Sequence, residues 1–174
     1  MDHLAARIEQ WRRELPDVDT TGMAILGRLR WITLQVRPSI EAVFAQHGID
    51  TGEFDVLSTL LRSGPPYRLR PTELYRSLMI SSGGLTARLD RLGKRGLIRR
   101  TDAGKDKRSL PVELTEEGRA LAQAAFREDM AVERELLSGL SEEETRDLTE
   151  RLERLALDIS AALDAQKAND SERL

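Results

Sequence analysis

Cysteine is absent from this chain of 174 residues, and only two histidines are present. The lack of cysteine excludes disulfide bonds and any switch that works by thiol oxidation. His3 and His47 lie far apart, and no H-E-x-x-H motif or G-x-x-x-x-G-K-S/T motif is present to hold zinc or phosphate. No histidine accompanies the serines in a pattern typical of nucleophilic catalysis. We therefore expect a protein that is not an enzyme and that uses no cofactor and no metal ion.

Long hydrophobic runs are missing as well. The N-terminal residues lack the unbroken apolar core of a signal peptide, and no window approaches the roughly 20 apolar residues of a membrane span. These absences predict a cytoplasmic protein without a membrane segment. Hydrophobic residues make up 40% of the chain, which is enough for one domain with a core of its own.

Charge is distributed unevenly along the chain. The formal net charge is −3, yet the segment from Arg62 to Arg108 carries 13 Lys or Arg and 4 Asp or Glu, a net of +9. The remainder carries 14 basic and 26 acidic residues, a net of −12. A basic segment of this kind is typical of a nucleic-acid-binding unit, because cations that neutralise phosphates supply most of the sequence-independent affinity. Such binding weakens as the salt concentration rises.

The basic segment has the pattern of two helices joined by a turn. A short helix is predicted to begin at Pro71, because proline is tolerated at the first helical position. Residues 81–84 interrupt the apolar pattern, and a second helix follows, which Gly96 caps at its C-terminal end. The apolar face of this second helix is formed by Leu85, Leu89 and Leu92. Its polar side is a candidate reader of base edges.

A β-hairpin is predicted after the second helix. Residues 97–101 and 109–114 have strand character, and the loop between them is rich in charge. In the returning strand, apolar residues alternate on one side at Leu110, Val112 and Leu114. A hairpin in this position is a wing. The predicted fold is therefore mainly α with a small β-hairpin wing, a winged helix-turn-helix over residues 52–118.

Helices are also predicted before this unit. They span about residues 4–15, 21–46 and 52–63. Thr51 is expected to cap the third of them. Pro38 lies inside the apolar pattern of the second, where proline removes a backbone hydrogen bond, so a kink or a break is expected there.

Two more helices are predicted after the wing. Thr115, followed by two glutamates, starts a helix of roughly twenty residues, and Ser141-Glu142-Glu143-Glu144 matches a capping box at the start of the last helix. Residues 166–174 form a polar tail. The helices within residues 1–47 and 119–165 exceed what a DNA-binding unit needs, so we interpret them as dimerisation helices. Packing within one chain is the alternative that the periodicity leaves open.

Spaced residues at the wing resemble the signature of a known family. Asp106-Lys107-Arg108-Ser109, followed by Val112, Leu114-Thr115 and Gly118, is similar to the D-x-R-S…V-x-L-T-x-x-G pattern of the MarR family of winged helix-turn-helix transcriptional regulators. The resemblance implies a homodimer that grips a palindromic operator, with recognition helices in successive major grooves and wing arginines in the neighbouring minor grooves. It also implies that Arg108 is the wing-tip arginine and Asp106 the acid that orients it.

We expect the DNA contacts to come from the helix-turn-helix and the wing. Arg91 is the candidate for a bidentate contact with guanine, and a narrow minor groove would attract Arg108. Gly83 and Gly84 either let the backbone approach DNA closely or form a tight turn. The expected DNA-binding residues are Arg70, Thr72, Ser81, Ser82, Gly84, Thr86, Arg91, Lys105, Asp106, Lys107, Arg108 and Ser109.

Four positions resemble the urate-responsive branch of the same family, in which a Trp, an Asp and two Arg residues define a ligand site between the dimer helices and the DNA-reading lobe. The matching residues here are Trp11, Asp55, Arg88 and Arg100. By this resemblance Arg88 pairs with an anionic ligand, Trp11 and Arg100 complete the site, and the ligand's charge repels Asp55. The alternatives are a core tryptophan, a solvated aspartate and an Arg88 that contacts phosphate. Urate is the first candidate ligand, and other small anions such as tricarboxylates are further candidates.

These observations predict a ligand-responsive, sequence-specific transcriptional regulator, a repressor that a small anion releases from its operator. The expected partners are double-stranded DNA, a second copy of the chain and the anionic effector. The alternative is a winged helix that serves protein contacts without a specific operator. The thirteen cations of the basic segment argue against this alternative.

Overall fold

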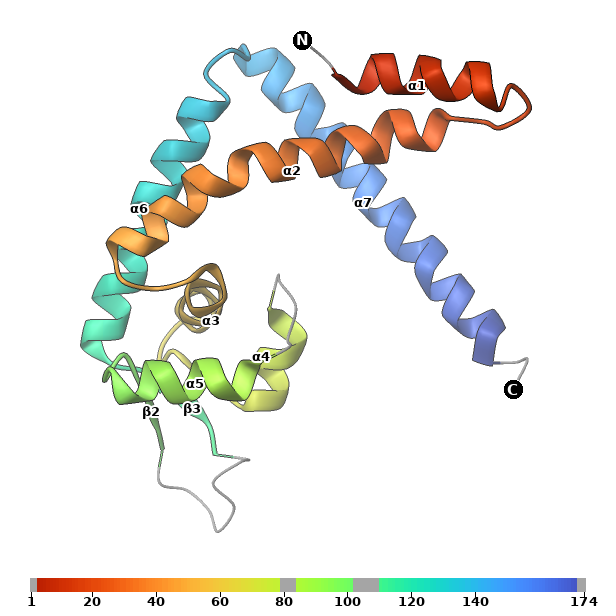
Figure 1. Cartoon of the computed structure of the whole chain (residues 1–174). Helices are drawn as coiled ribbons and strands as arrows, with labels where there is room; N and C mark the ends of the chain where they lie inside the picture. Colours follow the sequence, from red (N-terminus) through yellow and green to blue (C-terminus); the bar gives the residue numbers. More distant parts are fainter. Residues whose placement is uncertain (1–2, 79–83, 102–109, 172–174) are drawn as a thin grey trace. The chain divides into compact units, whose positions relative to one another are not determined.

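The computed structural model describes residues 3–78, 84–101 and 110–171. The chain divides into two compact units, Met1–Glu133 and Arg134–Leu174. The elements of the described residues, labelled in Figure 1, are α1 (His3–Glu14), α2 (Thr21–Gln46), α3 (Thr51–Arg62), β1 (Arg68–Leu69), α4 (Pro71–Ser77), α5 (Leu85–Lys94), β2 (Ile98–Arg100), β3 (Val112–Leu114), α6 (Glu116–Leu136) and α7 (Glu142–Ser171). This order confirms the predicted fold class, mainly α with a small wing.

The wing belongs to a three-stranded antiparallel sheet with the order β1-β3-β2. The pairing of β2 with β3 confirms the predicted hairpin, and the sheet also contains a third strand that the sequence did not predict. In the additional strand, β1, Arg68 lies opposite Glu113 and Leu69 lies opposite Val112. Two residues are too few to show an alternating pattern, so the sequence contained no signal for β1.

Side chains cap the starts of α3, α6 and α7. At α6, the Gly118 amide donates to Oγ1 of Thr115 at 3.0 Å, which confirms Thr115 as the cap. At α7, the Ser141 amide donates to Glu144 at 2.9 Å and the Glu144 amide donates to Ser141 at 3.2 Å, which confirms the capping box. The expected cap of α3 was wrong by one residue: Asp50 and not Thr51 accepts a hydrogen bond from the third helical amide.

Two helices are longer or more continuous than expected. α2 runs through Pro38 without a break, because a proline removes one hydrogen bond and the other turns of this helix of 26 residues remain. α7 includes residues 166–171, which were predicted to belong to a polar tail. Lys167 and Asp164 form an ion pair of 2.9 Å one turn apart there, and such pairs stabilise exposed helices.

The core of the first unit lies where the C-terminal end of α2 meets α3, α4, α5, the sheet and α6. Phe44 of α2 stacks on Phe54 of α3, with 4.1 Å between the ring centroids. The predicted apolar face of α5 is buried in this core, since Leu85, Leu89 and Leu92 are all at most 8% exposed. Burial of each such leucine stabilises the fold by about 1.5–3 kcal/mol. The core thus orients α5 so that its polar residues face outward.

Large apolar side chains are also left exposed within each unit. In the first unit they include Trp11, Ile25, Leu26, Trp31, Ile32 and Leu34 of α1 and α2. In the second unit they include Leu148, Leu152, Ile159 and Leu163 of the predicted stripe of α7. These apolar side chains are therefore not fully buried by the unit to which they belong. Among the described helices, none has a stretch long and apolar enough to cross a membrane.

Gly118 has no room for a side chain. A Cβ at this position would lie 1.9 Å from the carbonyl oxygen of Leu97, so the first turn of α6 packs directly on the backbone that leads into β2. Gly118→Ala is therefore expected to destabilise the protein by about 3 kcal/mol, because the clash is with backbone and not with a movable side chain. Thermal unfolding measures the loss.

Gly93 provides the matched control for this substitution. It lies within α5, and a Cβ there would meet nothing within 4 Å. Gly93→Ala should raise the stability by about 0.5–1 kcal/mol, since alanine is the better helix former. Equal effects of the two substitutions would contradict the close packing at Gly118.

Candidate DNA interface and ligand site

The turn before α5 depends on Gly84. This residue is the N-cap of α5 and has a φ of 77°, a left-handed conformation that residues with a Cβ rarely adopt. An added Cβ would meet nothing within 4 Å, so the backbone conformation, and not crowding inside the chain, requires glycine there. The same openness leaves the start of α5 accessible from outside.

An open groove lies between α4 and α5. Its lining combines the ends of both helices and consists of Pro71, Thr72, Tyr75, Arg76, Gly84, Leu85 and Thr86. Three predicted DNA-binding residues, Thr72, Gly84 and Thr86, are exposed along it. Arg70 precedes α4 and is also exposed, and its amide donates to Glu73 at 2.6 Å, so Glu73 satisfies the helix start that lacks a polar cap residue.

Tyr75 and Arg76 belong to this groove but were missed by sequence reasoning. Tyr75 is 60% exposed, and both residues follow Thr72 by three or four positions. Residues spaced three or four apart share one face of a helix, so the spacing from Thr72 was the available signal. The remaining predicted DNA contacts, Ser81, Ser82, Lys105, Asp106, Lys107, Arg108 and Ser109, lie outside the described residues.

A buried carboxylate joins the three strands of the sheet. Glu113 of β3 is only 6% exposed, and it accepts hydrogen bonds from Arg99 of β2 and from Nε of Arg68 in β1, the latter at 2.7 Å. The hydrogen bond from Arg99 holds the pKa of Glu113 below its ordinary value, against the effect of burial, and Arg68 adds to the lowering. This arrangement fixes two arginines at the base of the wing.

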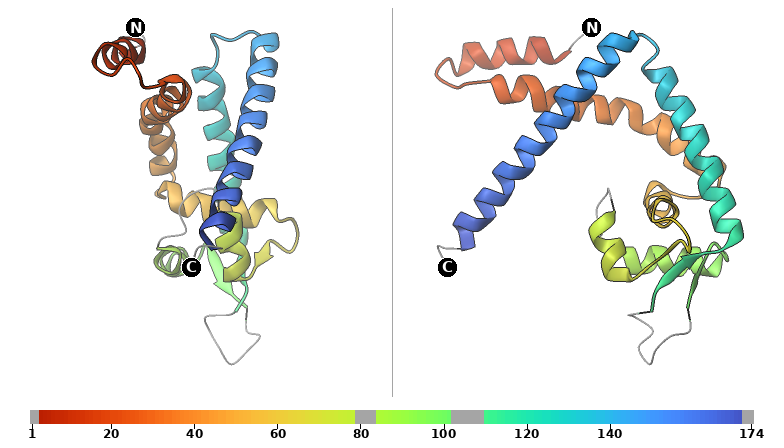
Figure 2. Two further views of the ribbon diagram at one scale, coloured as in Figure 1. Left: turned by 90° about the vertical axis from the view of Figure 1, so that its right-hand side faces the viewer. Right: turned by 180° about the vertical axis from the view of Figure 1, so that it is seen from behind.

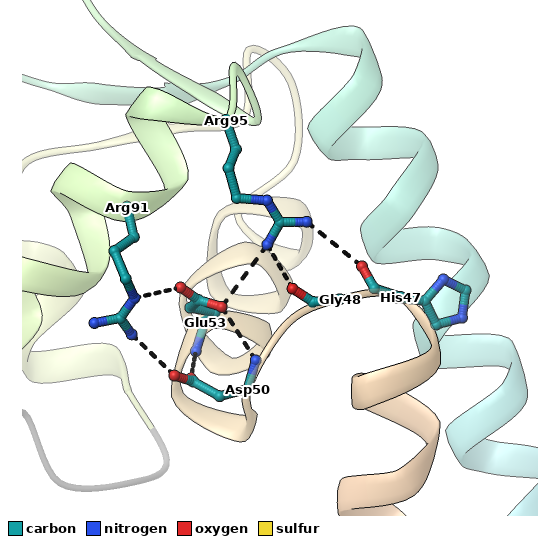
Figure 3. Close-up of polar contacts among 6 residues, drawn as sticks. All are labelled: His47, Gly48, Asp50, Glu53, Arg91 and Arg95. Atoms are coloured by element: carbon teal, nitrogen blue, oxygen red, sulfur yellow. Dashed lines mark hydrogen bonds and ion pairs between the residues drawn. The ribbon is translucent and has the colours of Figure 1, made fainter.

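Arg91 of α5 is held by two carboxylates, as Figure 3 shows. Its Nε donates to Glu53 at 2.7 Å and its Nη2 donates to Asp50 at 2.9 Å. The hydrogen bond to Glu53 is the largest cause of a raised pKa of the Arg91 guanidinium. The predicted bidentate contact with guanine stays a prediction. In this conformation Nε and one N–H of Nη2 are engaged with the two acids, so such a contact would use the remaining Nη N–H groups or require Arg91 to leave the acids.

The α3–α5 contact brings together two of the predicted ligand residues. The guanidinium of Arg88 lies against Gly52, so closely that a Cβ on Gly52 would be 2.3 Å from Nε of Arg88. Asp55 follows Gly52 by three residues on α3 and is 5% exposed. Arg100 lies in β2, and its Nη2 is 3.4 Å from Asp90 of α5.

Trp11 is not brought to this cluster within one chain. It lies on α1, is 50% exposed, and α1 packs along the N-terminal part of α2, where Leu4 contacts Gly27. Both Figure 1 and Figure 2 show α1 at the opposite end of α2 from α3 and α5. The physical reason is the length of α2, because 26 residues at about 1.5 Å each separate the two ends.

The described residues contain no group of three or more His, Asp or Glu side chains that could hold a metal ion. The arrangement instead offers an exposed groove between two short helices, with Arg70, Arg76 and Lys94 exposed on or near these helices. An accessible groove with cations nearby is typical of a surface that binds an extended polyanion.

Comparison with known proteins agrees with this geometry. A model of the MarR family matches residues 47–109. The HTH-type transcriptional regulator PecS from Dickeya dadantii is 39% identical over 148 residues, which cover 85% of this chain and 89% of PecS. The chain belongs to the MarR family. It is therefore a DNA-binding transcriptional regulator and not an enzyme.

Solved structures of MarR proteins have the same fold. A mutant MarR from E. coli, complexed with operator DNA, has a TM-score of 0.63 and 27% identity, and the match covers 79% of this chain and 99% of that one. A MarR family protein from Mycobacterium tuberculosis, in complex with p-aminosalicylic acid, has a TM-score of 0.61 and 28% identity. That match covers 76% of this chain and 98% of the other.

The charge at Glu113 predicts a pH dependence of stability. Because the pKa of Glu113 is lower in the folded protein, its contribution is present above the ordinary value of 4.5 and is lost as the pH falls through the folded value. Glu113→Gln should cost about 1 kcal/mol at pH 7, since both arginines are partly exposed. The melting temperature should fall by about 2–4 °C at pH 7.

The difference in melting temperature between the wild type and Glu113→Gln should shrink at an acidic pH below the folded pKa of Glu113, because the wild-type carboxyl is then protonated as well. Glu117→Gln on the exposed side of α6 serves as the control. Its melting temperature should equal that of the wild type at both pH values. A gap of constant size at both pH values would contradict the role of the Glu113 charge.

Proposed function

We propose that this MarR family member is a repressor that binds a palindromic operator as a homodimer in the cytoplasm and leaves it when a small anion binds. The exposed groove of α4 and α5 carries this proposal, because it places Thr72, Gly84 and Thr86 on one accessible surface of the basic segment. In helix-turn-helix regulators the second helix enters the major groove, and here that helix is α5.

The charges around the groove support binding to the phosphate backbone. Arg70 and Arg76 are exposed beside α4, and Lys94 is exposed at the end of α5. Wing residues 105–109 are proposed to reach the minor groove, with Arg108 at the tip. Phosphate contacts set the position on the duplex, and contacts with base edges then select the sequence.

The exposed apolar faces support a homodimer. Trp31, Ile32 and Leu34 lie on one stretch of α2 and are each 43–54% exposed. Leu152 and Leu163 of α7 are 40% and 50% exposed within their own unit. A second copy of the chain would remove such stripes from water, and two-fold pairing would place two copies of α5 about ten base pairs apart on a palindrome.

The cluster between α3 and α5 supports an anionic effector. Arg88 supplies positive charge beside Gly52, and the buried Asp55 lies one turn along α3. An anion bound at Arg88 would add negative charge near Asp55, and the repulsion would shift α5 relative to the operator. Because Trp11 lies at the far end of α2, its part in the site would require a neighbouring chain. Urate is the proposed ligand, and the related structure with p-aminosalicylic acid shows another small aromatic acid on this fold.

DNA binding is tested by fluorescence anisotropy on the duplex upstream of the protein's own gene, against scrambled DNA. We expect selective binding that weakens at least about tenfold between about 50 and 200 mM salt. Arg76→Ala should reduce the slope of log K against log salt by about 1, and Arg151→Ala on α7 should not change it.

The homodimer is tested by stoichiometry and by mass. Saturation should occur at two chains per duplex, and light scattering should give twice 19.6 kDa.

Equal affinity for operator and scrambled DNA would contradict a specific operator and favour the use of the winged helix as a protein-docking module. A mass of one chain at micromolar concentration would contradict the homodimer.

The ligand site is tested with the two tryptophans, Trp11 and Trp31. In Trp31→Phe, urate should quench the fluorescence of the remaining Trp11, and in Trp11→Phe it should not quench Trp31. Asp55→Asn should retain DNA binding. The factor by which urate lowers its DNA affinity should be at least about fivefold smaller than in the wild type, because the charge that the ligand repels is gone. If urate neither quenches Trp11 nor shifts the melting temperature, the urate assignment is wrong.

A further inference from the structure

Three arginine side chains from α5 and its C-terminal cap pack against the first turn of α3. Arg88, Arg91 and Arg95 follow one another at spacings of three and four residues, so they form one stripe on α5 beside its buried leucine face. Arg88 lies on Gly52, and Arg91 and Arg95 both approach Glu53. The arginines of α5 therefore lie along another helix of the same chain.

Glu53 is the acceptor on which this contact depends. Its side chain is 7% exposed, and three groups approach its carboxylate: the Asp50 amide at 3.1 Å, Nε of Arg91 at 2.7 Å and Nη1 of Arg95 at 3.9 Å. One carboxylate thus closes the capping box of α3 and binds α5. A buried carboxylate with these partners is costly to leave unpaired.

Arg95 extends the contact to the corner between α2 and α3. Its Nη1 donates to the carbonyl oxygen of Gly48 at 2.7 Å, and its Nη2 lies 3.5 Å from the carbonyl oxygen of His47 (Figure 3). The ring of His47 in turn lies 3.0 Å from Glu128 of α6. The end of α5 is therefore joined to the point where α2 ends and α3 begins.

We propose that Glu53 is a positioning residue that holds α5, through Arg91 and Arg95, in the orientation that binds DNA. This inference rests on the proposed function of α5 as the recognition helix. Arg91 then acts inside the protein and does not read bases. The same contact links the proposed effector site to DNA, because Gly52, which precedes Glu53 on α3, lies against Arg88 of α5.

The two roles of Arg91 predict opposite results for Glu53→Gln. If Arg91 reads guanine, loss of the competing carboxylate frees it, and operator binding tightens or stays the same. If Glu53 positions α5, operator binding weakens at least about fivefold. Arg91→Gln should weaken binding to a similar extent, and the double variant should bind no more weakly than the worse single variant, because both substitutions remove one interaction.

Glu144→Gln is the matched control for Glu53→Gln. Glu144 closes the same kind of capping box, with Ser141 at the start of α7, so the substitution removes a capping charge at a distance from α5 in sequence. Glu144→Gln should leave operator affinity unchanged. Thermal unfolding of each variant checks that the fold is retained.

Two readouts distinguish positioning from DNA contact. The slope of log K against log salt should stay at the wild-type value in Arg91→Gln, whereas loss of a phosphate contact would reduce it by about 1. Arg91→Lys keeps the charge but cannot donate to two carboxylates in one plane, so it should lose affinity as Arg91→Gln does. Arg91 is 49% exposed on its side chain, so these variants should fold even if Glu53→Gln does not.

The experiment separates this inference from the proposed function. Selective binding by the wild type together with unchanged or tighter binding by Glu53→Gln would overturn the positioning role and leave DNA binding intact. An Arg91→Gln variant with a reduced salt slope would overturn it as well. No selective binding by the wild type would overturn the proposed function and the inference together. In the free protein, hydrogen exchange of the Arg91 Nε–H should be slow and should become fast in Glu53→Gln.

Discussion

The carboxylate of Glu53 is the interaction that joins α3 to α5, and the proposed DNA-binding side depends on it. It accepts a hydrogen bond from the Asp50 amide at the start of α3, binds Arg91 and approaches Arg95, so α3 and α5, the proposed recognition helix, share one acceptor. The apolar stripe of α5 sets how deeply the helix is buried, but apolar contacts have little directionality. Hydrogen-bonded charges have directional geometry, and they can fix the helix at one rotation.

A similar arrangement occurs in the sheet, where the buried Glu113 on the central strand, β3, binds one arginine from β1 and one from β2. Part of the net positive charge of the basic segment is therefore used inside the protein. The cations left for phosphates on the described surface include Arg70, Arg76 and Lys94, which lie at the rim of the groove and near the end of α5. A count of arginines overstates the number that can contact DNA.

The proposed effector site lies at the same contact between α3 and α5. Arg88 of α5 rests on Gly52 of α3 and Asp55 is buried one turn along α3, so an anion bound at the proposed site would add charge beside both helices. A shift of the first turn of α3 would reach α5 through Glu53 as well as through the contact of Arg88 with Gly52, because both contacts join the two helices directly. In this view the effector site and the reading helix are coupled by direct contact rather than over a distance.

The sequence alone predicts the fold class, the helix-turn-helix and the wing, because the leucine periodicity of α5, Pro71, Gly96 and the family signature are local patterns. It also predicted the caps at Thr115 and Ser141. The third strand, the partners of Arg91 and the separation of Trp11 from Asp55 and Arg88 became visible only in the three-dimensional structure. The physical reason is that periodicity reports which face of a helix is apolar. Which acid an arginine meets depends on residues about forty positions away in the chain, and no local pattern contains that information.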